Sequence, residues 1–161
     1  TKDEFKNVIN GVKQVGSFVE IKKDTIIIKS NNLNNINLEI NEYPSFPTDL
    51  QQILSCVLLS ANNESTIVDN IYPQRNSQIT ELNKMNGNIK NINNQIIVNK
   101  SRLKGTVVTA KDLRCCFALI VAGSIASGET IIENAELLLR GYEKPLIKLK
   151  KIGIKVVEYL S

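Results

Sequence analysis

The sequence predicts an α/β repeat domain in which sheets are wrapped round inner helices. Its units read strand, helix, strand, helix, strand, strand (βαβαββ), with about two full units preceded by the end of a third. Three observations carry this fold class: an internal repeat, β-branched strands that alternate with helices, and a helix ending that occurs three times.

The internal repeat joins two long segments of the chain. "TDLQQILSCVLLSANNESTIVDN" (48–70) aligns with "KDLRCCFALIVAGSIASGETIIEN" (111–134), at a period of about 63 to 64 residues. Each segment reads Asp-Leu, an apolar helix, a small-residue exit, and a β-branched strand that ends in an acid and Asn. The helices are apolar nearly all round, which predicts that they lie inside the domain.

A second kind of helix follows each of these segments and carries Lys and Glu on one face. "ITELNKMNGNI" and "LIKLKKIGIKV" share an ending with each other and with "VINGVKQVGSFV" near the start. Gly16, Asn86-Gly87 and Gly153 stand at these endings, where a residue with positive φ caps a helix. The chain therefore contains three copies of the second-helix module and two of the first.

Periodicity and turn residues set the individual elements. The predicted strands are residues 18–22, 25–30, 35–40, 66–69, 88–92, 95–98, 105–109, 130–133 and 155–159. The predicted helices are residues 2–15, 48–61, 78–86, 112–126 and 142–152. "KKD" (22–24) and "NNQ" (93–95) read as hairpin turns.

Composition excludes several classes of function. The net charge is +4 and the lysines are scattered, which argues against a nucleic-acid surface. Histidine is absent, so acid–base chemistry falls to Asp, Glu, Lys, Tyr or Cys, and no spacing suggests a metal site. The longest apolar run, "CCFALIVAGSIA", is too short to cross a bilayer. Cys56, Cys115 and Cys116 lie in apolar helical segments, typical of reduced, buried thiols in a cytoplasmic protein.

Asp49, in "SFPTDLQQ", has two interpretations. Pro47 at the first turn, Thr48 as a cap and an acid favoured by the helix dipole describe an ordinary helix start. A carboxylate fixed on a rigid helix start also suits a general base that takes a proton from a bound hydroxyl.

Arg114 and Arg140 are candidate anion-binding residues, because a guanidinium is always charged and matches carboxylate or phosphate geometry. The alternative is a solvated or salt-bridged surface arginine. Arg114 stands two residues into a helix whose next dozen residues are nearly uncharged, an unusual place for a solvated charge.

The motifs "FPTDLQ" (46–51), "TAKDLR" (109–114), "AGSIASGET" (122–130) and "RGYEKPLIKLKKIGIKV" (140–156) resemble the UDP-N-acetylglucosamine enolpyruvyl transferases. The resemblance covers essentially the whole chain and corresponds to the C-terminal part of these enzymes. It implies an inside-out α/β domain and a chain, 1–161, that forms one partial C-terminal-type domain. The domain with the reactive cysteine loop is expected outside this chain, so Cys115 is read as core.

The resemblance also implies a reaction. The enolpyruvyl group of phosphoenolpyruvate moves to the 3-hydroxyl of UDP-N-acetylglucosamine, the first committed step of peptidoglycan precursor synthesis, without metal or organic cofactor. It implies that Asp49 is the sugar-binding base and that Arg114 and Arg140 contact phosphoenolpyruvate.

For the remaining site residues, the resemblance implies contacts with substrate. Asp112 orients Arg114 or lines the site, unless it is a plain helix-start acid. Arg75 lies near the reacting groups or on a loop surface. Thr48, Ile71 and Tyr72 contact the sugar nucleotide, partly through main chain, and Tyr72 faces the uracil or simply packs.

Departures from the family pattern leave a second reading open. "ELLL" (136–139) replaces a polar stretch before Arg140, and Asn76 replaces an aromatic residue after Arg75. The alternative is a catalytically silent paralogue or fragment that binds a sugar nucleotide or a protein partner; a bare α/β scaffold is a third. An RNA-end cyclase is disfavoured because that chemistry is expected to use histidine. The chain alone is expected to be inactive, and to associate with its missing half or with itself.

Overall fold

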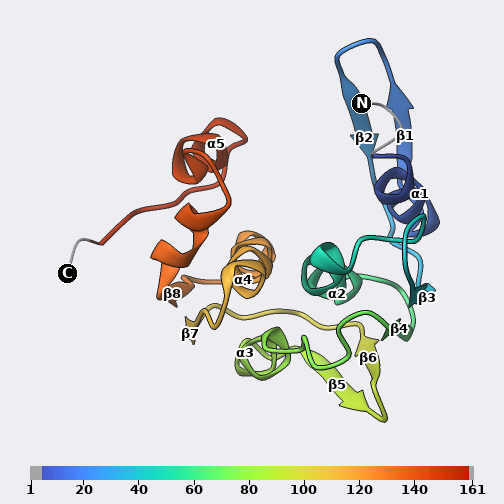
Figure 1. The fold of residues 1–161 in the computed structure, drawn as a ribbon. Coiled ribbons are helices and arrows are strands. Elements are labelled where there is room, and N and C mark those ends of the chain that lie inside the picture. The colour runs from blue at the N-terminus through green and yellow to red at the C-terminus, as the bar shows by residue number, and fades with distance from the viewer. Residues whose placement is uncertain (1–4, 160–161) are drawn as a thin grey trace.

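The computed structural model describes residues 5–159. Two inner helices pack together between a four-stranded sheet and a two-stranded parallel pair, and a separate antiparallel hairpin projects away beside the first helix (Figure 1). The elements in chain order are α1 (Lys6–Gln14), β1 (Phe18–Ile21), β2 (Ile26–Lys29), β3 (Asn37–Ile40), the 3-10 helix η1 (Thr48–Leu50), α2 (Gln51–Leu58), β4 (Ser65–Asp69), α3 (Gln78–Lys84), β5 (Asn88–Ile92), β6 (Gln95–Asn99), β7 (Val107–Thr109), α4 (Leu113–Ile125), β8 (Ile131–Glu133), the 3-10 helix η2 (Ala135–Arg140) and α5 (Pro145–Lys151).

The first complete unit runs from β3 to β6 and forms a four-stranded sheet in the order β3-β4-β6-β5. β3 and β4 are parallel, with α2 as their crossover, while β6 is antiparallel to both β4 and β5. Asn93 and Asn94 join β5 to β6 with φ of 52° and 63°, the conformation that a tight hairpin needs. The predicted hairpin turn is confirmed.

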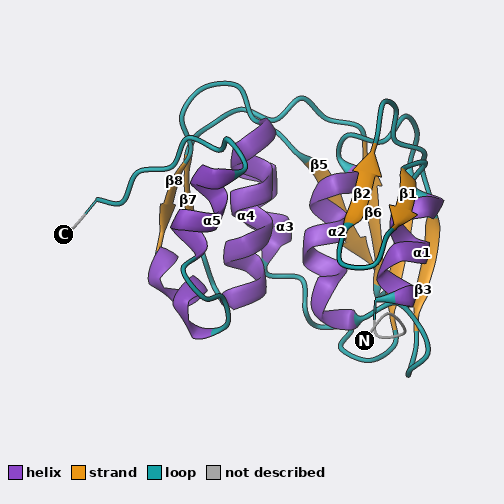
Figure 2. Cartoon of the chain, turned by 90° about the horizontal axis from the view of Figure 1, so that it is seen from above, coloured by secondary structure: helices purple, strands orange, loops and turns teal. Residues whose placement is uncertain are grey.

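The inner position of α2 and α4 is also confirmed. The two helices pack against each other between the four-stranded sheet and the β7–β8 pair (Figure 2). Leu58 on α2 and Leu119 on α4 are fully buried in one shared core cluster. Burying such a side chain contributes roughly 1.5–3 kcal/mol, which explains why these helices are apolar nearly all round.

The predicted helix endings are confirmed at all three positions. Gly16, Asn86 and Gly153 have φ of 88°, 66° and 89° after α1, α3 and α5. A residue in this left-handed region turns the chain out of the helix, and glycine or asparagine adopts it most easily. The first predicted helix begins at residue 2, but residues 2–4 lie outside the described part of the chain.

The second unit is less complete than predicted. β7 and β8 pair in parallel, and α4 connects them along the chain, as α2 connects β3 and β4 in the first unit. The strand predicted at 155–159 is wrong, because residues 153–159 have no regular structure and Val157 and Tyr159 are 70% and 73% exposed. An isolated strand leaves its main-chain hydrogen-bonding groups without a partner strand, so it has no reason to form.

No helix of the described chain is long and apolar enough to cross a membrane; the apolar α4 has 13 residues. Among residues 5–159, no group of three or more His, Cys, Asp or Glu side chains is arranged to hold a metal ion.

Candidate active site

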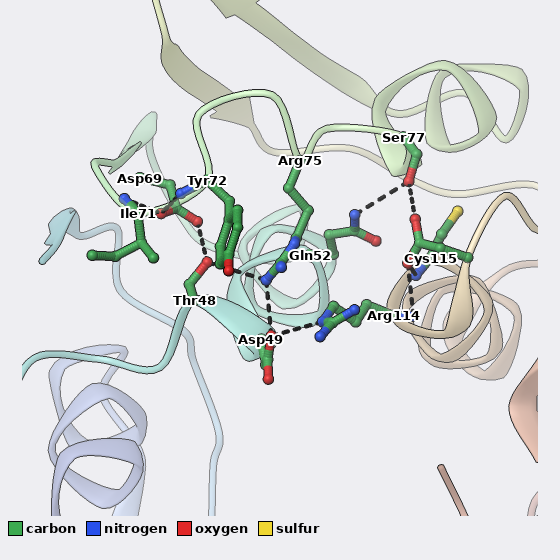
Figure 3. Close-up of polar contacts among 11 residues, drawn as sticks. Thr48, Asp49, Gln52, Asp69, Ile71, Tyr72, Arg75, Ser77, Arg114 and Cys115 are labelled. Carbon is green, nitrogen blue, oxygen red and sulfur yellow. Dashed lines mark hydrogen bonds and ion pairs between the residues drawn. The ribbon is translucent and has the colours of Figure 1, made fainter. Parts of the chain in front are cut away.

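Asp49 lies at the point where the two repeats meet. It stands in η1, the turn that leads into α2, and its side chain is 61% exposed. One carboxylate oxygen, Oδ1, accepts hydrogen bonds from Nη1 of Arg75 and from Nε of Arg114, each at 2.8 Å (Figure 3). The structure therefore brings together three residues that the sequence predicted for the site.

The two arginines hold Asp49 in its charged form. The hydrogen bond from Arg114, aided by the charges of both arginines, keeps the pKa of Asp49 below its usual value of 3.8, although partial burial opposes this. The same hydrogen bond raises the pKa of Arg114 above its usual value. Within the described chain Oδ2 accepts no hydrogen bond, so it is free to accept one from a hydroxyl group.

Thr48 does not cap the helix, contrary to the sequence-based expectation. Its hydroxyl donates to Oδ2 of Asp69 at 2.6 Å, and its oxygen accepts from Nη1 of Arg75 at 3.2 Å. Neither η1 nor α2 has a side-chain cap. A capping threonine accepts a hydrogen bond from a main-chain N–H, whereas here the Thr48 oxygen accepts from Arg75 and its proton points to Asp69.

Ile71 and Tyr72 follow Asp69 in the loop after β4. Their main-chain N–H groups donate to Oδ1 of Asp69 at 2.9 and 3.0 Å. These donors are therefore occupied, and contact with a sugar nucleotide through them is not available in this conformation. Tyr72 is 53% exposed. Its ring lies against Arg75, with 4.2 Å between the guanidinium carbon and the ring centre.

Asp112 occupies the position in the second repeat that Asp49 occupies in the first, and its contacts differ. It caps α4, because its Oδ1 accepts from the main-chain N–H of Arg114 and of Cys115 at 2.9 and 3.0 Å. Its Oδ2 accepts from the hydroxyl of Ser77 at 2.6 Å, and Ser77 in turn accepts from Gln52. Asp112 thus holds the main chain of Arg114, and no hydrogen bond joins it to the guanidinium within the described chain.

Burial alone would raise the pKa of Asp112. The hydrogen bonds from Ser77 and from the main-chain N–H groups of Cys115 and Arg114 outweigh it and leave the pKa below 3.8. Asp112 is therefore charged at neutral pH, with both oxygens engaged.

Arg140 is not joined to this cluster. It ends η2 and is exposed, and its side chain makes no hydrogen bond or ion pair with any residue from 5 to 159. The expected helix at 142–152 begins only at Pro145, because Lys144 adopts the left-handed conformation and proline takes the first helical position. "ELLL" lies within η2, where Leu138 is buried. Gly141 packs on the side chain of Leu113, where a Cβ would lie 2.6 Å from Leu113 Cδ2. Arg140 consequently lies at the same end of α4 as Arg114.

Cys115 is buried, as the sequence indicates. Burial raises the pKa of its thiol and raises the pKa of Cys116 to about 11 and of Cys56 to about 12. A raised pKa lowers the fraction of thiolate at neutral pH, and burial keeps all three thiols from solvent, as expected of cysteines in the core.

Three residues of the hydrogen-bonded cluster around Asp49 and Asp112 escaped the sequence-based prediction: Asp69, Ser77 and Gln52. Tyr142 lies apart from their hydrogen bonds and stacks on Phe117 with 4.6 Å between ring centres; burial raises its pKa, which the charge of Arg114 opposes. The repeated acid-Asn strand ending was the available signal for Asp69. Single serine and glutamine residues carry no comparable signal.

Inner helices enclosed by repeated βαβ sheets, with acids and arginines at the helix starts, define the architecture of an enolpyruvyl transferase domain. The chain belongs to the EPSP synthase (3-phosphoshikimate 1-carboxyvinyltransferase) family, whose sequence profile matches residues 2–149.

Curated relatives carry a more specific name. UDP-N-acetylglucosamine 1-carboxyvinyltransferase of Streptococcus pneumoniae (strain Hungary19A-6) is 40% identical over 160 residues, which cover 97% of this chain and 38% of that protein. UDP-N-acetylglucosamine 1-carboxyvinyltransferase 2 of Lactococcus lactis is 38% identical over 156 residues, 96% of this chain and 37% of that protein. The chain therefore spans less than two fifths of the length of these relatives.

Solved structures confirm the fold. The enolpyruvyl transferase NikO from Streptomyces tendae superposes with a TM-score of 0.84 at 20% identity, covering 92% of this chain and 35% of that chain. EPSP synthase from Acinetobacter baumannii gives a TM-score of 0.60 at 17% identity, with 88% and 37% covered. The predicted inside-out α/β fold of the enolpyruvyl transferase type is thus confirmed.

Proposed function

We propose that this chain is part of a transferase that moves the enolpyruvyl group of phosphoenolpyruvate to the 3-hydroxyl of UDP-N-acetylglucosamine. One observation carries the proposal: two arginines fix Asp49 through Oδ1 while its Oδ2 accepts no hydrogen bond from residues 5–159, in a chain 40% identical to a UDP-N-acetylglucosamine 1-carboxyvinyltransferase. This supports the enzymatic reading over the silent paralogue.

Asp49 serves as the general base in this proposal. Its Oδ2 accepts the hydrogen bond of the sugar 3-hydroxyl and then the proton, as the hydroxyl oxygen attacks the phosphate-bearing carbon of phosphoenolpyruvate. The π bond of the double bond breaks as the methylene carbon takes a proton from a general acid. Loss of a proton from the same carbon, with departure of inorganic phosphate, then restores the double bond. A carboxylate with a low pKa is a weak base, and Arg114 is the main cause of that low pKa. An anionic second substrate that pairs with Arg114 weakens its hold on Asp49, so the carboxylate becomes more basic once both substrates are bound.

Arg114 and Arg75 supply the positive charge for phosphoenolpyruvate. Arg114 uses only Nε toward Asp49, and its side chain is 33% exposed, so its two terminal amino groups are available for a carboxylate or phosphate. Arg140 remains a predicted further contact, approaching from η2 at the same end of α4. No metal or organic cofactor is needed for this chemistry.

The chain supplies one wall of the proposed cleft, as part of a C-terminal-type domain in a cytoplasmic enzyme of peptidoglycan precursor synthesis. An apolar groove of about 550 Å³ between α1 and α2 supports a further unit of the same protein as its neighbour. The greater length of the relatives supports the same arrangement, in which the remaining wall and the reactive cysteine loop come from elsewhere in the protein.

Release of inorganic phosphate from phosphoenolpyruvate tests the proposal. The protein that carries this chain is assayed with UDP-N-acetylglucosamine and, in parallel, with 3-phosphoshikimate as acceptor. We expect phosphate release only with the sugar nucleotide, lost in Asp49→Asn and retained in Asp24→Asn, a matched change at the exposed tip of the β1–β2 hairpin. Phosphate release with 3-phosphoshikimate but not with the sugar nucleotide contradicts the proposed function. Absence of phosphate release with both acceptors contradicts it as well.

A further inference from the structure

Asp69 is a buried carboxylate beneath the candidate active site. It is the last residue of β4 and is only 4% exposed. Its Oδ1 accepts from the main-chain N–H of Ile71 and Tyr72, which closes a turn at the end of the strand. Its Oδ2 accepts from the hydroxyl of Thr48 at 2.6 Å. Every one of these contacts requires an acceptor at position 69.

The acceptor character of Asp69 fixes the direction of the neighbouring hydrogen bonds. The Thr48 hydroxyl donates to Oδ2 of Asp69, so its proton points toward Asp69. The lone pairs of Thr48 Oγ1 then face Nη1 of Arg75, 3.2 Å away. Nη1 carries two protons, and its other hydrogen bond reaches Oδ1 of Asp49 at 2.8 Å.

A second support for Arg75 depends on the same carboxylate. The turn held by Asp69 Oδ1 places the Tyr72 ring 4.2 Å from the guanidinium carbon of Arg75. The guanidinium is therefore held in its plane by Thr48 and on its face by Tyr72, as Figure 3 shows. Both supports are anchored on Asp69.

We propose that Asp69 is a positioning residue of the site, which holds Arg75 against Asp49 through Thr48 on one side and Tyr72 on the other. The role rests on the proposed function, since a support for Asp49 matters only where Asp49 does chemistry. The contacts themselves are present without substrate, so the support is measurable without turnover.

The test is the titration of the Asp49 carboxyl in the substrate-free chain, followed by carboxyl NMR in the wild type and in Asp69→Asn. The asparagine of this variant keeps an oxygen for the N–H groups of Ile71 and Tyr72, but its NH₂ cannot accept the Thr48 proton. If Arg75 is released, the pKa of Asp49 rises, by less than in Arg114→Met, because Arg114 is the larger cause of the low pKa. Removal of a negative charge alone would lower the pKa of Asp49, so the sign separates positioning from simple charge.

Thr48→Val provides a second variant that changes no charge and keeps the side-chain shape. We expect Thr48→Val to raise the pKa of Asp49 as Asp69→Asn does. Thr48→Ser keeps the hydroxyl and should leave the pKa at the wild-type value. In the double variant Thr48→Val, Asp69→Asn, the pKa of Asp49 should rise little further than in either single variant. Glu39→Gln is the matched charge control: Glu39 accepts a hydrogen bond from Asn70, next to Asp69, and no hydrogen bond joins it to Arg75 in the described chain.

An unchanged or lowered Asp49 pKa in a folded Asp69→Asn protein overturns the proposal. If Asp69→Asn does not fold, an unchanged pKa in Thr48→Val overturns it equally. A raised pKa in both variants, with no phosphate release from phosphoenolpyruvate by the protein that carries this chain, would uphold the positioning role while rejecting the proposed function.

Discussion

The Nε atom of Arg114 lies 2.8 Å from Oδ1 of Asp49, across 65 positions of the sequence. This contact joins the starts of the two inner helices, because Arg114 lies in the first turn of α4 and Asp49 in the turn that opens α2. It makes Arg114 both the main cause of the low pKa of Asp49 and a cation at hand for an anionic substrate. Changing Arg114 therefore has consequences for binding as well as for charge.

Arg114→Ala is expected to raise the apparent KM for phosphoenolpyruvate by about 10- to 100-fold, since a charge-assisted hydrogen bond contributes about 1.5–3 kcal/mol. Steady-state kinetics of the protein that carries this chain measures the effect. Arg102→Ala is the control, since its side chain makes no hydrogen bond or ion pair within residues 5–159. A KM for phosphoenolpyruvate that is the same in Arg114→Ala and wild type would reject the role of Arg114.

The two repeat-equivalent aspartates should differ in their effect on stability. Asp112 caps α4 and Asp49 caps nothing, so Asp112→Ala should lower the free energy of unfolding by about 1 kcal/mol, within roughly 0.5–2. Asp49→Ala should change it by less than about 0.5 kcal/mol, because its ion pairs are exposed to solvent. Urea denaturation of the two variants makes the comparison, and equal losses would contradict the assigned contacts.

Stability should fall in acid through the same groups. The pKa values of Asp49 and Asp112 lie below the usual 3.8 in the folded chain, so both contribute stability that is fully present above about pH 4. As the pH falls, the unfolded chain binds protons at these two carboxylates before the folded chain does. The stability that the two carboxylates contribute is therefore lost as the pH falls through their folded-state pKa values. Asp112→Asn should flatten the decline of the unfolding free energy between about pH 4 and pH 2. A decline as steep as in the wild type would show that the hydrogen bonds to Asp112 do not lower its pKa.

The three thiols should be slow to react. Burial raises the pKa of Cys56 to about 12 and of Cys116 to about 11, and Cys115 is fully buried. We expect a thiol reagent at about pH 8 to modify all three in denaturant and none rapidly in buffer. Rapid modification of Cys115 in the native protein would contradict its place in the core.

Local signals and the repeat predicted much of the fold. Asn93–Asn94 marked a hairpin, and Gly16, Asn86 and Gly153 marked helix endings, because these residues adopt positive φ most easily. The prediction of a strand at 155–159 is wrong for a non-local reason. A β-branched segment forms a strand only beside a partner strand, and no partner strand lies next to these residues in the described chain.

The sequence predicts the charged residues of the site but not the hydrogen bonds that join them. Asp49, Arg75 and Arg114 come together as expected, whereas Thr48 turns from the helix to Asp69. Which of several acceptors a hydroxyl finds depends on the positions of β4 and η1 in space, and no spacing in the sequence encodes that. Arg140 stays a prediction, since within the described chain its side chain joins none of the other site residues.

The base role of Asp49 is tested most directly by comparing phosphate release by the wild type and Asp49→Asn, with phosphoenolpyruvate and UDP-N-acetylglucosamine both saturating. The asparagine introduced by this change retains an oxygen to accept hydrogen bonds from the arginines and the sugar hydroxyl, but it takes up no proton. We predict a kcat lower by about 100-fold or more, with the KM for UDP-N-acetylglucosamine changed only a few-fold. A kcat within a few-fold of the wild type would contradict the assignment of Asp49 as the base.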